Sequence, residues 1–134
     1  MVRRFVSALV LCCVVVGLVG GCNSGPKLVP VKGRLTLKGK PCPGVAVNLN
    51  TGEVNGQGFI GSTDGDGNFV MHNLFGKPGV TPGNYTVAIT IPIDSPGGSM
   101  VPAALCGKTS PWKVTIADAP ERVLDLDMSK PTAE

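Results

Sequence analysis

The sequence predicts an all-β protein, a seven-stranded antiparallel β-sandwich of the prealbumin or immunoglobulin type, preceded by a signal peptide. The chain has 134 residues, which suits a single domain. Its 19 glycines and 12 prolines favour many turns and short strands over long helices. Beyond residue 21, apolar and polar residues alternate in seven short stretches, and none of these stretches shows a helical period.

The first 21 residues have the order of a secretory signal. Two arginines precede an uncharged run rich in Val and Leu, residues 5–19, and two glycines then precede Cys22. The run has about 15 residues, whereas a helix that crosses a bilayer needs ~20. We therefore expect residues 1–21 to be a signal peptide, with a permanent transmembrane anchor as the alternative.

The ending VGGC, residues 19–22, resembles the lipobox of bacterial lipoproteins. The resemblance implies a diacylglycerol on the sulfur of Cys22, cleavage before this residue, and acylation of the new amino terminus with a chain such as palmitate. A cysteine suits this role because its thiolate is a strong nucleophile. The expected location is the bacterial cell envelope, periplasmic or outer surface. The membrane is then a partner, and the lipid on Cys22 takes the place of any cofactor.

Loss of the signal leaves a nearly neutral body. Removing 21 residues and their two arginines leaves 113 of the 134 residues, with 10 basic against 9 acidic side chains. Such a body attracts nucleic acid weakly, and aromatic residues, at 4%, are too few for base stacking. We therefore expect no nucleic-acid partner. Residues 22–28 are expected to be a tether, residues 29–129 the domain and residues 130–134 a tail.

The first half of the domain is expected to hold four strands. Apolar and polar residues alternate over residues 31–38 and over residues 45–49, and the Gly/Pro-rich turn between them completes a hairpin. Residues 58–63 form a weaker third strand, because two glycines interrupt it. The letters DGDG then mark a tight turn. Residues 68–72 follow as the fourth strand, with one phenylalanine and one methionine on the same face.

The second half is expected to hold three strands. Residues 85–91 alternate most regularly, and Tyr85 is expected to bury its ring while its hydroxyl bonds a loop backbone. Residues 92–111 are rich in Pro, Gly and Ser and form a long irregular segment. Residues 112–116 and 124–128 are the sixth and seventh strands. Seven short strands in about a hundred residues are typical of a two-sheet sandwich.

Three motifs occur in order along the chain: GKPCPGV, TDGDGNF and PGNYTV. Together with the strands around them, over residues 29–128, they resemble the carboxypeptidase regulatory-like, transthyretin-like domains of bacterial surface lipoproteins. The resemblance implies a seven-stranded prealbumin-like sandwich without intrinsic catalysis. It does not imply a ligand.

Asp64, Asp66 and Asn68 alternate as in the opening of a calcium loop. An EF-type loop needs glycine at its sixth position and glutamate at its twelfth. Phe69 and Phe75 occupy these positions. A tight turn between strands selects the same Asp and Gly residues, so the pattern favours a turn, with a weak calcium site as the alternative and no other metal expected.

The sequence gives little support for an enzyme. His72 is the only histidine and is expected at the solvent-facing rim of the sandwich, and no GxSxG motif surrounds a serine. Asp125 and Asp127 alternate with leucines, which favours a solvated outer face over paired acid–base chemistry. We therefore expect a protein that is not an enzyme.

Two cysteines remain after the signal and the lipidated residue are accounted for. Cys42 and Cys106 lie 64 positions apart in a chain expected to reach an oxidising compartment. A disulfide between them would stabilise the fold by ~4 kcal/mol under the chain-entropy model. Two separate thiols are the alternative, and the sequence leaves both open.

These observations predict a lipid-anchored protein of the cell envelope. Its non-catalytic β-sandwich is expected to act as a structural module or as an interaction module for an envelope protein or polysaccharide. The alternative is a small-ligand or calcium-binding module that uses Asp64, Asp66 and the long segment of residues 92–111, because loops on rigid sandwiches carry recognition.

Overall fold

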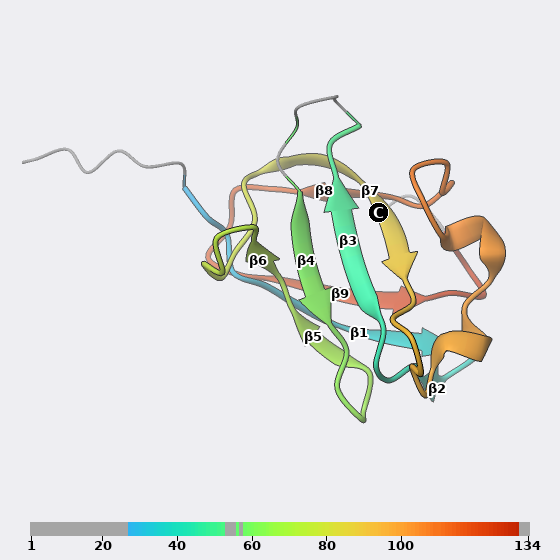
Figure 1. Ribbon diagram of the computed structural model, residues 1–134. Coiled ribbons are helices and arrows are strands. Elements are labelled where there is room, and N and C mark those ends of the chain that lie inside the picture. Colours follow the sequence, from blue (N-terminus) through green and yellow to red (C-terminus); the bar gives the residue numbers. More distant parts are fainter. Residues whose placement is uncertain (1–26, 53–55, 57, 132–134) are drawn as a thin grey trace, which may run out of the picture.

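The computed structural model describes residues 27–52, 56 and 58–131, which fold into two β-sheets packed face to face (Figure 1). This confirms the all-β prediction. The predicted signal peptide, residues 1–21, and Cys22 lie outside the described residues. The first sheet contains β1 (Val31–Leu37), β2 (Lys40–Pro41), β5 (Asn68–Val70) and β9 (Arg122–Asp127). The second contains β3 (Ala46–Asn50), β4 (Phe59–Ser62), β6 (His72–Asn73), β7 (Gly83–Thr90) and β8 (Lys113–Ile116).

Strand β1 is the centre of the first sheet. Along one edge it pairs with β9 in parallel, from Val31 opposite Arg122 to Thr36 opposite Asp127. Along the other edge it pairs first with β5 and then with β2, both antiparallel. The prediction of a wholly antiparallel sandwich is therefore wrong at β1 and β9. Alternation specifies which face of a strand is buried, whereas the direction of its neighbour depends on how the chain crosses between sheets.

The second sheet is antiparallel throughout, in the order β6-β4-β3-β7-β8. Strands β5 and β6 are separated only by Met71, and the chain passes from the first sheet to the second at this residue. The predicted single strand over residues 68–72 is therefore divided between the two sheets. The two-residue strands β2 and β6 raise the number of strands in the described chain above the predicted seven.

The predicted hairpin between residues 31–38 and 45–49 is wrong. Strand β1 turns back into β2 through Lys38 and Gly39, which both have positive φ, as a two-residue type I′ turn requires. Strand β3 lies in the other sheet, between β4 and β7. Periodicity predicted both strands but could not specify their partners, because each strand presents its apolar residues to the same core.

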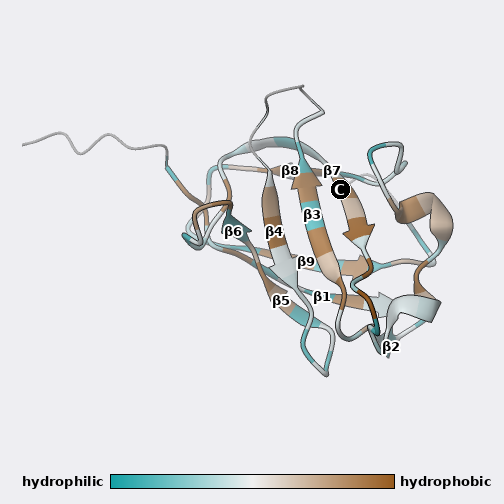
Figure 2. Cartoon of the chain, in the orientation of Figure 1, coloured by the Kyte–Doolittle hydropathy of each residue, from teal (hydrophilic) through white to brown (hydrophobic). Residues whose placement is uncertain are grey.

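The core lies between the two sheets and includes residues from nearly every strand. Figure 2 shows the resulting alternation on β3, where hydrophobic residues flank a hydrophilic one. The ring of Phe59 meets the ring of Tyr85 edge-on, with centroids 5.7 Å apart. The Tyr85 hydroxyl donates to the carbonyl oxygen of Thr81 at 2.6 Å. The expectation of a buried ring with its hydroxyl on a loop backbone is therefore confirmed.

The long segment between β7 and β8 is irregular, as predicted, but it packs against the body. It contains two short 3-10 helices, η2 (Gly98–Met100) and η3 (Ala103–Leu105), and the Leu105 side chain is buried. Its Gly97 amide donates to the carbonyl of Pro43, and the Ser95 hydroxyl donates to the carbonyl of Gly44. The segment therefore closes the end of the sandwich where β2 leads into β3.

Candidate functional site

An open groove of about 1250 Å³ crosses the outer face of the first sheet and continues onto β4 and β6. It lies over the corner where β5 gives way to β6, so residues far apart in the sequence meet there. The outward-facing side chains that line it are Lys32, Arg34 and Thr36 of β1, Ile60 and Ser62 of β4, Asn68 and Val70 of β5, His72 and Asn73 of β6, and Val123, Asp125 and Asp127 of β9.

One part of the groove is aliphatic. Val70 and Val123 face outward on β5 and β9 and are 48% and 58% exposed, and Ile60 and Leu74 are also exposed along the groove. Alternation assigns polar residues to these outward positions, so their apolar side chains are not explained by the core. Val70 and Val123 lie on either side of Lys32, which pairs with both, so they flank the aliphatic stem of this lysine. Exposed apolar surface gathered in this way marks a contact surface more often than a scattered surface residue does.

The groove also carries charges of both signs. The Lys32 ammonium lies 2.6 Å from a carboxylate oxygen of Glu121 on the surface. The Arg34 guanidinium donates through Nε to the carbonyl oxygen of Asp66 at 3.1 Å, which ties β1 to the turn before β5. Asp125 is exposed beside them on β9. The groove therefore offers donors, acceptors and aliphatic surface together.

His72 lies on this groove, half-buried at the rim of the sandwich, as predicted. Its Nδ1 is 3.0 Å from the carbonyl oxygen of Val70, so the ring is held by the backbone two residues before it. Within the described residues, no hydrogen bond joins the His72 ring to a carboxylate or a hydroxyl.

Asp125 and Asp127 lie on the outer face of β9, as predicted, but they are not equivalent. Asp127 Oδ1 accepts hydrogen bonds from the Ser129 hydroxyl at 2.7 Å and the Ser129 amide at 2.9 Å, and a third from the Lys38 amide at 3.2 Å. These bonds, led by the one from the Ser129 hydroxyl, lower the pKa of Asp127. Its charge therefore anchors the turn after β9 and the β1–β2 turn.

The carboxylate of Asp64 holds a turn. Its Oδ1 accepts hydrogen bonds from the amides of Asp66 and Asn68, both at 2.9 Å, and its carbonyl accepts from the Gly67 amide. This arrangement is an Asx-type turn, which Asp favours. Over the described part of the chain, no three His, Cys, Asp or Glu side chains gather closely enough to hold a metal ion.

Cys42 and Cys106 are both free thiols in the structure. Cys42 is buried, and its thiol donates to the carbonyl oxygen of Gly97 at 3.4 Å. Cys106 is only partly buried and directs its thiol to the carbonyl oxygen of Pro102 at 3.9 Å. Burial raises the pKa of the Cys42 thiol. The structure thus shows the arrangement with two separate thiols, and the disulfide stays a prediction that direct chemistry must decide.

The sequence predictions did not find the groove. In the sequence, the groove is indicated only by apolar residues at outward-facing strand positions. Ile60, Val70 and Val123 each occupy a position at which the alternation predicts a polar side chain. The five strands that line the groove come from distant parts of the chain, so only the fold brings these positions together.

Comparison of the chain with known protein families, with curated proteins and with solved structures finds no match. None of the helices in the described part of the chain has the length and apolar content needed to cross a lipid bilayer.

Proposed function

We propose that this protein is a lipid-anchored lipoprotein of the bacterial cell envelope whose non-catalytic, transthyretin-like sandwich binds a protein partner through the groove. The anchor is supported by the order of basic, apolar and small residues that ends at Cys22. It is also consistent with position, because the first residue paired to the sandwich, Val29, lies only seven residues after the predicted lipid attachment site.

The observation that carries the binding role is the pairing of exposed aliphatic and charged side chains on one continuous groove. Protein interfaces combine an apolar centre with a polar, charged rim. Val70 and Val123 supply apolar surface on either side of the Lys32 stem. Arg34 and Asp125, which pair across β1 and β9, supply charges beside it.

A polysaccharide partner has less support than a protein. Sugar rings commonly stack on exposed aromatic faces, whereas Phe69, the aromatic ring at the floor of this groove, is buried. Trp112 and Tyr85 are also buried in the core. A calcium-binding role has less support too, because the Asp64 carboxylate is already engaged by two amides.

The anchor is tested by mass spectrometry of the amino-terminal peptide of protein extracted from bacterial membranes. We expect cleavage before Cys22 and a mass increase equal to a diacylglycerol and one further acyl chain, both lost in Cys22→Ala. The matched control is Cys106→Ala, which removes a partly exposed thiol and leaves the lipid in place. An unprocessed, unacylated chain would overturn the anchor.

The groove is tested by placing a photo-crosslinking amino acid at Val70 or Val123 of the full chain in cells. The control position is Ile91, an exposed apolar residue that does not line the groove. We expect both groove positions to crosslink the same envelope protein and Ile91 not to do so. Crosslinks that are absent, or that are the same from all three positions, would contradict a protein-binding groove.

A further inference from the structure

A turn at one end of the sandwich displays two adjacent apolar side chains. Leu74 and Phe75 follow β6 and are 74% and 87% exposed. The turn itself does not need them. Asn73 Oδ1 accepts hydrogen bonds from the amides of Phe75 and Lys77, both at 2.9 Å, and Gly76 provides the positive φ. Folding therefore explains Asn73 and Gly76 but leaves the exposed leucine and phenylalanine unexplained.

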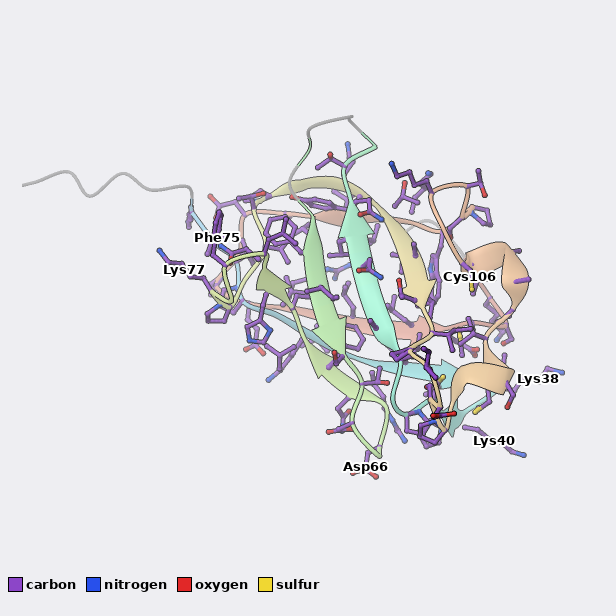
Figure 3. All side chains as sticks on the ribbon, viewed as in Figure 1. Lys38, Lys40, Asp66, Phe75, Lys77 and Cys106 are labelled. Atoms are coloured by element: carbon purple, nitrogen blue, oxygen red, sulfur yellow. The ribbon has the colours of Figure 1, made fainter. Side chains whose placement is uncertain are left out.

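This turn lies at the end of the body where the described chain begins. Val29 and Val80 exchange two backbone hydrogen bonds, and the Gly79 amide donates to the carbonyl of Met71, just before β6. The amino-terminal segment therefore enters beside the turn. Figure 3 shows Phe75 and Lys77 at this end, and the β1–β2 turn with Lys38 lies at the far end of the molecule.

Chain length then limits how far this end can be from the membrane. An extended chain spans at most about 3.6 Å per residue. The five residue-to-residue steps from Cys22 to Lys27 therefore reach no more than about 18 Å. With lipid on Cys22, the end of the body that carries Leu74 and Phe75 stays close to the bilayer surface.

We infer that the Leu74–Phe75 turn is a second membrane contact, which inserts these two side chains into the interface of the bilayer that holds the Cys22 lipid. This inference rests on the proposed lipid anchor. Amphipathic contact of this type buries apolar side chains at the headgroup boundary and keeps cations in the headgroup layer. Lys77, exposed in the same turn, is placed to meet anionic headgroups.

The contact fixes the orientation of the sandwich. Lys40 and Cys106, which Figure 3 shows at the side of the molecule away from Phe75, then lie on the side away from the membrane. The groove begins beside Leu74 and runs toward Asp127 and Gly39, so its Asp127 end then points away from the membrane.

The test uses the full chain, purified with its lipid and reconstituted into phosphatidylethanolamine and phosphatidylglycerol vesicles. Phe75→Trp places an indole in the turn, and Ile93→Trp is the matched control. Ile93 is 95% exposed and lies just beyond the end of β7, where Thr90 pairs with Ala46. The Phe75 turn follows β6 at the opposite end of this sheet, where Phe59 pairs with Asn73. The native Trp112 is 2% exposed and gives the same background in both variants.

For Phe75→Trp we expect the fluorescence of the introduced tryptophan to shift to shorter wavelength in vesicles. We also expect this fluorescence to be quenched when the vesicles contain brominated lipid. For Ile93→Trp we expect neither change. Absence of quenching in Phe75→Trp, or equal quenching in both variants, would overturn the inference even when mass spectrometry finds the lipid on Cys22. A chain without lipid on Cys22 would instead overturn the anchor, so the two failures are distinguishable.

Discussion

The ring of Phe69 lies directly against Gly33, in the space where the first sheet meets β4. A Cβ atom added at Gly33 would stand 2.6 Å from Cζ of this ring and 2.3 Å from the carbonyl oxygen of Leu124. A Cβ atom added at Gly61 of β4 would stand 3.2 Å from Cδ2 of the same Phe69 ring. Both β1 and β4 therefore have a glycine next to the Phe69 ring, and the absence of a side chain at these two positions leaves room for the ring beneath the groove.

Gly33→Ala should destabilise the fold, because the added methyl group meets backbone as well as the Phe69 ring. Leu124 is held in register with Gly33 by the parallel pairing of β1 and β9, so its carbonyl cannot move aside cheaply. Overpacking of this type costs about 1–3 kcal/mol. Chemical denaturation should show a loss of this size in the free energy of unfolding. Gly65→Ala is the matched control, since a Cβ there meets nothing within 4 Å, and equal losses in both variants would refute the explanation.

Tyr85→Phe should weaken the fold without altering the core. The hydroxyl of Tyr85 is 2.6 Å from the carbonyl oxygen of Thr81 and 2.8 Å from its hydroxyl, and the ring itself is buried. Loss of the hydroxyl leaves the Thr81 carbonyl without this donor, at a cost of about 1 kcal/mol. Thermal unfolding should show the lower stability, and Thr81→Val, which keeps the bond to the carbonyl, should lose less. A Tyr85→Phe variant as stable as the wild type would show that water replaces the hydroxyl at no cost.

Local pattern predicted most of the strands, because alternation reports which side chains face the core. It could not predict that β1 pairs with β9, since these strands are separated by most of the domain and their register depends on a crossover. The same limit explains the wrong hairpin. Residues 31–38 and 45–49 alternate correctly, but Lys38 and Gly39 turn the chain into the two-residue β2 first. Strand partners are tertiary information that two-residue periodicity does not contain.

The candidate site was harder to predict than the fold. Asp64 and His72 are candidates by residue type, because their side chains carry chemistry, yet the structure shows both held by nearby backbone groups. The groove depends instead on ordinary residues such as Val70 and Val123, whose interest comes only from where β5 and β9 place them. Residue type predicts candidate chemistry, whereas a surface assembled from several strands requires the fold.

The two remaining thiols should differ in reactivity. Cys42 is fully buried and Cys106 is partly exposed, and the thiolate is the form that reacts. A short pulse of iodoacetamide on the native protein should therefore label Cys106 and spare Cys42, as read by peptide mass spectrometry. In denaturant without reductant, both should be labelled. If neither Cys42 nor Cys106 is labelled in denaturant without reductant, the two residues form the disulfide that the sequence allows.

Burial of Cys42 should also make stability depend on pH. Because burial raises the pKa of this thiol, the folded state holds its proton more tightly than the unfolded chain, for which the pKa is 9.0. The contribution of the buried, protonated Cys42 thiol to the free energy of unfolding is complete below pH 9.0. It is lost as the pH rises through the pKa that this thiol has in the folded state. The free energy of unfolding should therefore fall more steeply above pH 9.0 in the wild type than in Cys42→Ala. Parallel curves for the two proteins would show that Cys42 is not responsible.

Asp64→Ala should separate the turn from the calcium alternative. The variant removes an acceptor from the Asp66 and Asn68 amides and should lower the free energy of unfolding by about 1 kcal/mol, whereas Asp64→Asn keeps an acceptor and should lose less. A ligand that binds only the folded state raises its stability by mass action. We expect millimolar calcium to leave the melting temperature of the wild type unchanged, and we expect the same of magnesium, which serves as the control. A rise with calcium that disappears in Asp64→Asn would instead establish a cation site at this turn, because that variant loses the charge while keeping the hydrogen bonds that shape the backbone.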